Sequence, residues 1–274
     1  MLFTLVSASS LNAADVTTVS TTTTAPFELG FDFLVIVQGR IGEIDGLKFI
    51  VDTGSSDTVI DENVARRLRL PRRPGKVTSF DRDIPVSRTE IGELRAGPIR
   101  AARANVIVAK LKDYTEFAQG VDGIIGLDLL SRGKKLSIDY ERQVVSFEAT
   151  GGQEGGPAPS RSFVVPIAVQ GARMSVLVDT GLRYFMLYKD RLRKGLPKVR
   201  TEGESRPVAI GRLQATRVNL PGVRIVGPET VATVFLIDGP ESLDRSGIDG
   251  YLGAMSLHAR RIEWDFVGHI LRWQ

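Results

Sequence analysis

The tripeptide Asp-Thr-Gly occurs twice in this chain, at Asp52–Gly54 and at Asp179–Gly181, and each copy follows a run of apolar residues. A carboxylate between a buried strand and a glycine turn lies where desolvation can change its pKa. A single copy would mean little, because aspartate before glycine is common in ordinary turns and helix caps. Two copies indicate a pair of carboxylates that serve one site.

A second pair of matching segments lies downstream, VDGIIG from Val121 and IDGYLG from Ile248. The offsets agree, because 179 − 52 = 127 for the first motif and 249 − 122 = 127 for the aspartates of the second. Two unrelated motifs with one shared period indicate an internal duplication, and a period of this length lets each copy build its own core. We therefore expect two similar lobes.

If the lobes pack about a pseudo-twofold axis, equivalent loops meet at that axis and Asp52 faces Asp179. Two carboxyls at close range cannot both ionise cheaply, so the pair holds one proton and titrates as a unit. The ionised carboxylate can then take a proton from water while the protonated one hydrogen-bonds a carbonyl oxygen. This chemistry needs no metal and no cofactor, and we expect none.

The residues that follow each aspartate suit this arrangement. Gly54 and Gly181 let the backbone approach closely, and their amides can donate to the carboxylates. We expect Thr53 and Thr180 to hydrogen-bond across the axis and lock the two loops, with Ser55 supporting the first loop.

Composition limits the function classes. The 274 residues are 42% hydrophobic and 25% charged, typical of a globular protein, without the long apolar run of a membrane-spanning helix. Scattered basic residues and a net charge of +4 give no reason to expect a nucleic-acid partner. The absence of cysteine excludes disulfides, thiolate catalysis and zinc-cysteine sites, and two histidines are too few for a histidine-rich metal site.

Four segments are expected along the chain. Residues 1–26 combine a short signal-like apolar stretch with a Thr-rich tract, which predicts a flexible N-terminus and a periplasmic or secreted protein. Residues 27–149 form the first lobe, residues 150–160 a Gly/Pro linker, and residues 161–274 the second lobe. With both lobes in one chain, a dimer is not needed, so we expect a monomer.

The apolar periodicity predicts a mainly β protein with few short helices. In the first lobe, a strand at Leu34–Val37 reverses over Gly39–Gly46 into a strand at Leu47–Val51. Asp61 is the expected N-cap of a short helix that Pro71 stops. Other expected elements are strands at Thr89–Leu94 and Ala104–Val108 and a helix around Lys189–Lys194.

VDTGSSDTVI at Val51–Ile60 resembles the active-site loop of the pepsin–retropepsin clan of aspartic proteases, nearest to bacterial retropepsin-like proteins with two fused lobes. GIIG at Gly123–Gly126 and GYLG at Gly250–Gly253 resemble the clan's hydrophobic-hydrophobic-Gly element beneath that loop. The resemblance runs from about Phe31 to the C-terminus. It implies two retropepsin-like β-barrel lobes related by a pseudo-twofold axis.

For function, the resemblance implies an aspartic endopeptidase with Asp52 and Asp179 as catalytic residues and a peptide substrate bound extended between the lobes. It also implies β-hairpin flaps, for which the matching stretches are near Thr78–Val86 and Thr201–Pro207. Leu182 departs from the family, which usually has Ser, Thr or Ala there. A lost hydroxyl at this position predicts that Asp179 holds the proton more readily, and a bulky leucine there could narrow the cleft.

Two other functions remain open. A catalytically inactive peptide-binding module on the same fold is one alternative, for which Leu182 is the main support. A hydrolase with Ser55 or Ser56 as nucleophile is disfavoured, because both histidines lie close to the C-terminus. The aspartates of the downstream motif, Asp122 and Asp249, are expected to be structural because Asp-Gly is a common turn pair.

Overall fold

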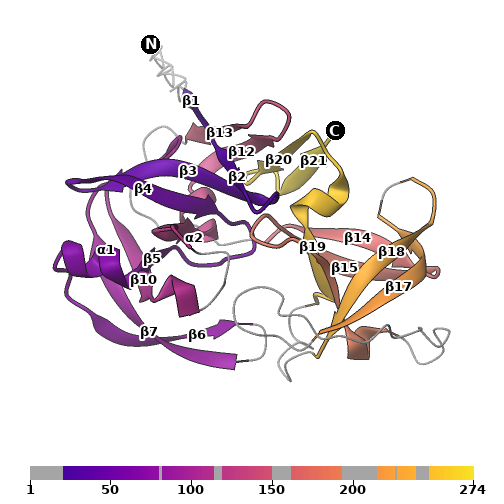
Figure 1. Ribbon diagram of the computed structural model, residues 1–274. Coiled ribbons are helices and arrows are strands. Elements are labelled where there is room, and N and C mark those ends of the chain that lie inside the picture. The colour runs from indigo at the N-terminus through magenta and orange to yellow at the C-terminus, as the bar shows by residue number, and fades with distance from the viewer. Residues whose placement is uncertain are drawn as a thin grey trace, which may run out of the picture.

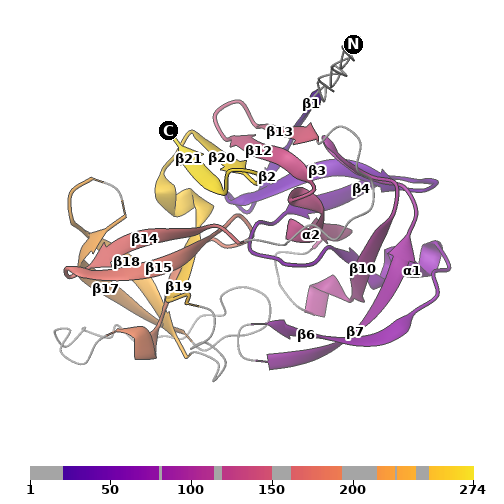
Figure 2. The ribbon, with the colours of Figure 1, turned by 180° about the vertical axis from the view of Figure 1, so that it is seen from behind.

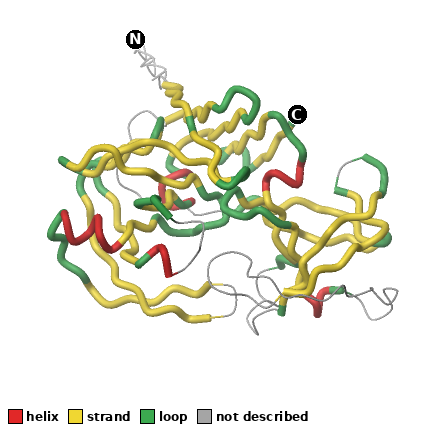
Figure 3. Tube along the Cα trace, viewed as in Figure 1, coloured by secondary structure: helices red, strands yellow, loops and turns green. Residues whose placement is uncertain are grey.

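The computed structural model describes residues 21–79, 82–113, 119–149, 162–192, 215–225, 227–238 and 247–274. Strands dominate this part of the chain, and the helices are short (Figure 3). The N-terminal half and the C-terminal half form two lobes that lie on opposite sides of the molecule, and a third sheet lies over both (Figures 1 and 2). The two-lobed β architecture expected from the sequence is confirmed.

The first lobe contains one sheet in the order β6-β7-β10-β5-β11-β4-β3-β8-β9, with β2 paired to β3. Three short helices lie beside it in the described residues. The strands are β2 (Glu28–Gly30), β3 (Leu34–Ile41), β4 (Ile44–Val51), β5 (Val59–Asp61), β6 (Arg73–Ser79), β7 (Arg82–Ile91), β8 (Leu94–Ala96), β9 (Ile99–Ala101), β10 (Ala104–Ala109) and β11 (Gly123–Ile125), and the helices are α1 (Glu62–Arg67), η1 (Leu111–Asp113) and α2 (Leu127–Leu130).

The second lobe is a closed barrel in the order β14-β15-β19-β16-β18-β17. Only short 3₁₀ turns accompany it in the described residues. Its elements are β14 (Val164–Val169), β15 (Ala172–Asp179), β16 (Phe185–Tyr188), η3 (Lys189–Arg191), β17 (Ala215–Arg224), β18 (Thr230–Ile237), β19 (Gly250–Gly253) and η5 (Ala254–Leu257).

The same strand pairings recur in both lobes around the two motifs. β4 leads to Asp52 and pairs in parallel with β11, while β15 ends at Asp179 and pairs in parallel with β19. β5 and β16, which follow the two loops, pair antiparallel with β11 and β19 respectively. Each Asp-Thr-Gly turn is therefore held between a buried strand and its glycine-bearing neighbour.

A five-stranded sheet joins the lobes, in the order β1-β13-β12-β20-β21. β1 (Thr21–Pro26), β12 (Gly133–Asp139) and β13 (Val144–Ala149) precede the second lobe in the chain, whereas β20 (Arg261–Asp265) and β21 (Ile270–Trp273) end it. At the seam Leu136 stands opposite Trp264, and both side chains are fully buried. The indigo, pink and yellow strands of this shared sheet lie side by side in Figures 1 and 2.

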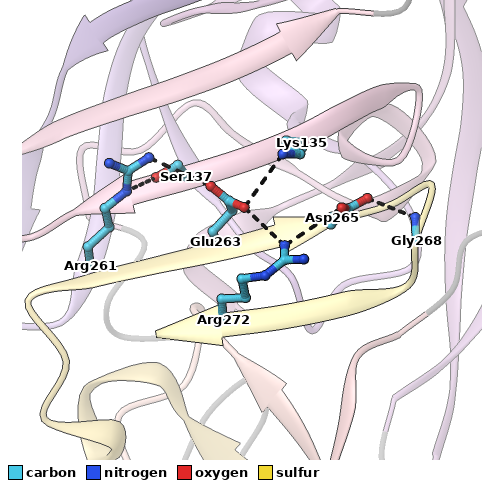
Figure 4. Close-up of polar contacts among 7 residues, drawn as sticks. All are labelled: Lys135, Ser137, Arg261, Glu263, Asp265, Gly268 and Arg272. Atoms are coloured by element: carbon cyan, nitrogen blue, oxygen red, sulfur yellow. Dashed lines mark hydrogen bonds and ion pairs between the residues drawn. The ribbon is translucent and has the colours of Figure 1, made fainter. Parts of the chain in front are cut away.

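Charged side chains cross the same seam on the other face of the shared sheet (Figure 4). Glu263 lies 3.2 Å from Arg272, 3.7 Å from Arg261 and 3.8 Å from Lys135. Arg261 also donates from Nε to Ser137 Oγ at 2.7 Å. Because most of these charges are partly solvated, their pairs contribute little each, and the apolar face carries most of the attachment.

Some expectations from the sequence were wrong. The Thr-rich residues Thr21–Pro26 are not flexible but form β1, because their β-branched side chains suit an extended strand that pairs with β13. The predicted reversal over Gly39–Gly46 is much tighter, since β3 and β4 run on to Ile41 and Ile44. The helix expected around Lys189–Lys194 is a single 3₁₀ turn, Lys189–Arg191.

The helix cap expected at Asp61 is confirmed, whereas the expected linker falls outside the described residues. Asp61 caps α1 as predicted, accepting a hydrogen bond from the backbone N–H of Asn63 at 2.9 Å. The linker over residues 150–160 lies outside the described residues, as do residues 1–20. Among the described residues, none of the helices has the length and hydrophobicity that crossing a membrane would require.

The buried seam of the shared sheet leads to a prediction about the free energy of unfolding. Trp264→Ala removes a fully buried side chain at the seam, so we expect a loss of about 3–5 kcal/mol in unfolding free energy. Urea titration followed by circular dichroism measures it. Val267→Ala, on a side chain that is 75% exposed in the same hairpin, is the control and should change stability by under about 0.5 kcal/mol. Equal midpoints for the two variants would contradict this role for the sheet.

Candidate active site

β11 and β19, the strands of the GIIG and GYLG segments, pack against the two Asp-Thr-Gly loops. The N–H of Asp52 donates to Ile125 O at 3.0 Å, which ties the first loop to β11. A Cβ on Gly126 would stand 2.5 Å from Asp57 O, and one on Gly253 would stand 2.5 Å from Leu182 O. Only glycine therefore fits beneath each loop, which explains the final glycine of GIIG and GYLG.

Reciprocal hydrogen bonds between two threonines join the loops. The N–H of Thr53 donates to Thr180 Oγ1 at 3.0 Å, and the N–H of Thr180 donates to Thr53 Oγ1 at 3.2 Å. Each hydroxyl in turn donates to the opposite lobe, Thr53 to Val178 O at 3.1 Å and Thr180 to Val51 O at 2.7 Å. Both threonines are 1% exposed, so no water competes for these bonds. The hydrogen bonds expected across the axis are present.

The structure brings Asp52 and Asp179 together. Their exposed fractions are 6% and 9%, and each carboxyl lies against the glycine of the opposite loop. Asp52 Oδ1 accepts from the N–H of Gly54 at 2.8 Å and of Ser55 at 3.1 Å, and Asp179 Oδ1 accepts from the N–H of Gly181 at 2.7 Å. These contacts hold both carboxyls in fixed positions.

Each glycine of the tripeptides also packs against the carboxyl of the other lobe. A Cβ on Gly54 would overlap the carboxyl group of Asp179, and one on Gly181 would stand 2.5 Å from Asp52 Oδ2. Any side chain at these positions would push the carboxyls apart. The glycines are therefore required by the closeness of the two acids.

Burial raises the pKa of both acids. The pKa of Asp179 lies well above its ordinary value, because of burial first and the neighbouring charge of Asp52 second. The pKa of Asp52 is raised by burial too, but backbone N–H donors and the hydrogen bond from Asp179 oppose that rise. Both acids therefore resist ionisation, and the directions of the two shifts make Asp179 the more readily protonated member of the pair.

The cause of this asymmetry differs from the one expected. Ser55 Oγ donates to Asp57 O at 2.8 Å, so its hydroxyl does not serve the carboxyl of Asp52 and the lack of a hydroxyl at position 182 matters less than predicted. Leu182 is 2% exposed and packs with Met186 and Phe235 inside the second lobe. Its side chain is core and does not narrow a cleft.

Asp122 and Asp249 are structural, as expected. Asp122 Oδ2 accepts from the N–H of Lys48 at 2.9 Å, and Asp249 Oδ2 accepts from the N–H of Ser175 at 2.7 Å. Asp122 thus ties the start of β11 to β4, and Asp249 ties the start of β19 to β15. Neither takes part in the carboxyl pair.

Arg183 forms a link between the lobes that the sequence did not predict. Its Nη1 donates to Phe31 O at 3.2 Å, and its guanidinium lies 6.0 Å from the centre of the Phe33 ring. The second loop is thereby attached to a turn of the first lobe. No sequence signal could have found this contact, because one partner is a backbone carbonyl 152 residues away.

The predicted flap of the first lobe coincides with the β6–β7 hairpin, which is paired as far as Ser79 and Arg82. The base of the hairpin is tied to the first loop, because Arg88 Nη1 lies 2.9 Å from Asp57 Oδ1. Residues 80–81 at its turn and the second predicted flap, Thr201–Pro207, lie outside the described residues.

Comparison with known proteins agrees with this geometry. Residues 37–129 match the family model described as aspartyl protease. A search of curated proteins found no match. Among solved structures, an aspartic proteinase from Irpex lacteus is similar to 92% of this chain over 96% of its own length, with a TM-score of 0.53 and 15% identity.

A retropepsin-like aspartic protease from Rickettsia conorii matches 50% of this chain over 97% of its own length, with a TM-score of 0.36 and 17% identity. The family match covers the first Asp-Thr-Gly loop and its glycine-bearing neighbour, and the fungal structure covers both lobes. The chain therefore resembles the pepsin–retropepsin clan of aspartic proteases, in sequence over residues 37–129 and in fold over most of its length.

Proposed function

We propose that the protein is an aspartic endopeptidase in which Asp52 and Asp179 activate water for peptide-bond hydrolysis. One observation carries the proposal: two carboxyls are buried at one place, and each is packed against the glycine of the other loop. Structural ion pairs do not need this arrangement, whereas general acid–base catalysis does. The family match over the first lobe supports the same class of reaction.

In the proposed mechanism, ionised Asp52 takes a proton from a water molecule whose oxygen attacks the carbonyl carbon of the substrate. Protonated Asp179 donates to the carbonyl oxygen, where negative charge develops. The resulting tetrahedral intermediate then breaks its C–N bond as the nitrogen takes a proton from the pair. Thr53, Thr180, Gly54, Gly181 and Ser55 act by positioning the two acids.

The inactive peptide-binding alternative loses its main support. It rested on Leu182, and that side chain is buried in the apolar cluster of Met186 and Phe235 in the second lobe. A chain without turnover would also have no need for two acids whose ionisation is made costly by burial. We therefore propose the enzyme and treat the binding module as the outcome to be excluded by experiment.

The first prediction from this mechanism concerns the two acids. Asp52→Asn and Asp179→Asn should each lower the rate of peptide cleavage by at least about 10²–10⁴-fold, because each removes one half of the acid–base pair. Cleavage of a diverse peptide mixture, read by mass spectrometry, measures the loss. Asp122→Asn is the matched control, because the Asp122 side chain accepts from the backbone N–H of Lys48 and lies outside the carboxyl pair, and it should keep wild-type activity. Turnover that survives Asp179→Asn contradicts the mechanism.

The second prediction concerns pH. Turnover needs one protonated and one ionised carboxyl, so the rate should rise on acidification as Asp179 takes its proton and fall again once Asp52 is protonated. Because the pKa of Asp179 is well above the ordinary value, the basic limb should lie well above pH 3.8. Initial rates across the pH range give the profile. A rate that keeps rising to alkaline pH would rule out a proton-sharing pair.

The third prediction concerns stability. An acid with a raised folded-state pKa binds its proton more tightly when folded, so it costs stability above that pKa and the cost disappears as pH falls. Asp179→Asn should therefore be more stable than wild type at alkaline pH, with the difference shrinking toward pH 3.8. Thermal unfolding at a series of pH values tests this. A difference that does not change with pH would be inconsistent with a buried ionising pair.

A further inference from the structure

One face of the sheet in each lobe carries the aspartate of the Asp-Thr-Gly motif. Successive side chains of a strand point to opposite faces, so Leu177 lies on the same face of β15 as Asp179. In the first lobe Asp52 directly follows β4 and stands two residues after Ile50. The intervening valine of each lobe belongs to the apolar core, so it points the other way. We call the face that carries Asp52 or Asp179 the acid face of its lobe.

Cross-strand pairing places a row of three side chains on each acid face. Paired residues of neighbouring strands lie on the same face of a sheet, and β11 and β19 each pair with a strand on both sides. The rows consist of Ile50, Ile124 and Val59 in the first lobe and of Leu177, Tyr251 and Met186 in the second. The offsets agree, because 177 − 50, 251 − 124 and 186 − 59 all equal 127. The two rows therefore occupy equivalent positions beside the two carboxyls.

The second row is bulkier than the first. Leucine and isoleucine are isomers, so Leu177 matches Ile50 in size. At the other two positions the second lobe has the larger residue, tyrosine in place of isoleucine and methionine in place of valine. Where the strands are equivalent, larger side chains leave less space between them and a bound molecule. A side chain that lies on the second row therefore has less room than one that lies on the first.

A second tyrosine holds Tyr251 in place. Tyr188 Oη donates to Tyr251 Oη at 3.2 Å, and the two rings meet edge to face with their centres 6.0 Å apart. Because Tyr188 is only 1% exposed, it is packed too tightly to swing aside with Tyr251. The first lobe has Asp61 at the equivalent position, since 188 − 127 = 61, and that carboxylate accepts from the backbone N–H groups of Asn63 and Leu111. The anchored ring is therefore a feature of the second lobe.

Tyr251 also lies near the carboxyl pair. Burial raises the pKa of its phenol, the hydrogen bond from Tyr188 opposes that rise, and the negative charge of Asp179 adds to it. Its ring is only partly buried, whereas Leu177 and Met186 on either side of it are buried. Within the second row, Tyr251 is therefore the residue that a molecule bound at Asp179 would meet.

We infer that Tyr251 is a specificity-determining residue, and that the protein prefers peptides with a large aliphatic side chain on one side of the cleaved bond and a small side chain on the other. The inference rests on the proposed endopeptidase function, with an extended peptide bound between the lobes. A peptide has no twofold symmetry, so the residues on the two sides of its cleaved bond meet different lobes. The residue that meets the aliphatic row of the first lobe can be large, whereas the one that meets Tyr251 must be small.

The experiment uses peptides in which a reduced amide replaces the cleaved bond, so that they bind without being hydrolysed. Alanine, valine and leucine are placed in turn on one side of the reduced amide, and a second series varies the other side in the same way. On one side only, the wild-type chain should bind the leucine peptide at least about tenfold more weakly than the alanine peptide. Isothermal titration calorimetry gives the affinities.

Reciprocal variants identify the residue. Tyr251→Ile gives the second lobe the residue of the first, so it should strengthen binding of the restricted leucine peptide at least about tenfold. Ile124→Tyr should create a size limit on the opposite side of the reduced amide. Tyr140→Ile is the matched control, because Tyr140 is a partly buried tyrosine that packs on Phe27 with ring centres 6.0 Å apart, and it should change neither series. If Ile124→Tyr does not fold, Tyr251→Ile decides the question alone.

The outcomes separate this inference from the proposed function. Absence of binding, equal size limits on both sides, or a limit that survives Tyr251→Ile overturns the inference, and so do two variants that act on the same side. Unmodified peptides with the preferred side chains test hydrolysis separately. If the reduced-amide peptides follow the size rule and Tyr251→Ile relaxes it, but the unmodified peptides stay intact, the endopeptidase fails and the size rule belongs to a peptide-binding module.

Discussion

The reciprocal hydrogen bonds between Thr53 and Thr180 are the constraint on which the site depends. Each hydroxyl accepts from a backbone N–H of the opposite loop and donates to a carbonyl of the opposite lobe, so four buried bonds join the loops at one point. Loss of either hydroxyl would leave several buried polar groups without partners, which is expensive. The position of one loop therefore fixes the position of the other, and with it the separation of the carboxyls.

Once the loops are fixed, the electrostatics of the pair follow. Asp52 and Asp179 are both largely removed from solvent, so burial opposes ionisation of each and repulsion opposes ionisation of both. The backbone donors at Gly54 and Ser55 favour the charge on Asp52. The shared sheet, with Trp264 buried at its seam, supplies the apolar stabilisation that lets the loops keep this costly arrangement.

Much of the site could be predicted from the sequence, because its parts are local motifs repeated at one period. The 127-residue spacing identified Asp52 and Asp179, which the structure brings together, and the shared proton stays a prediction from the repulsion of like charges. The Thr-rich segment before Phe27 was predicted to be flexible because its composition resembles that of a linker. It forms a strand because it pairs with the edge of β13, and that pairing cannot be seen in the segment's own sequence. The attachment of Arg183 to Phe31 could not be predicted, since it depends on how two distant turns meet.

The chain order of the shared sheet has a consequence for biosynthesis. β20 and β21 are translated after the strands of the second lobe, yet they pair with β12, which precedes that lobe in the chain. Lobes generally fold as units while synthesis proceeds from the N-terminus. A nascent chain can therefore complete its first lobe on the ribosome, but it cannot close the seam that braces the two carboxyls until β20 and β21 have left the exit tunnel. Assembly of the site therefore follows translation of both lobes.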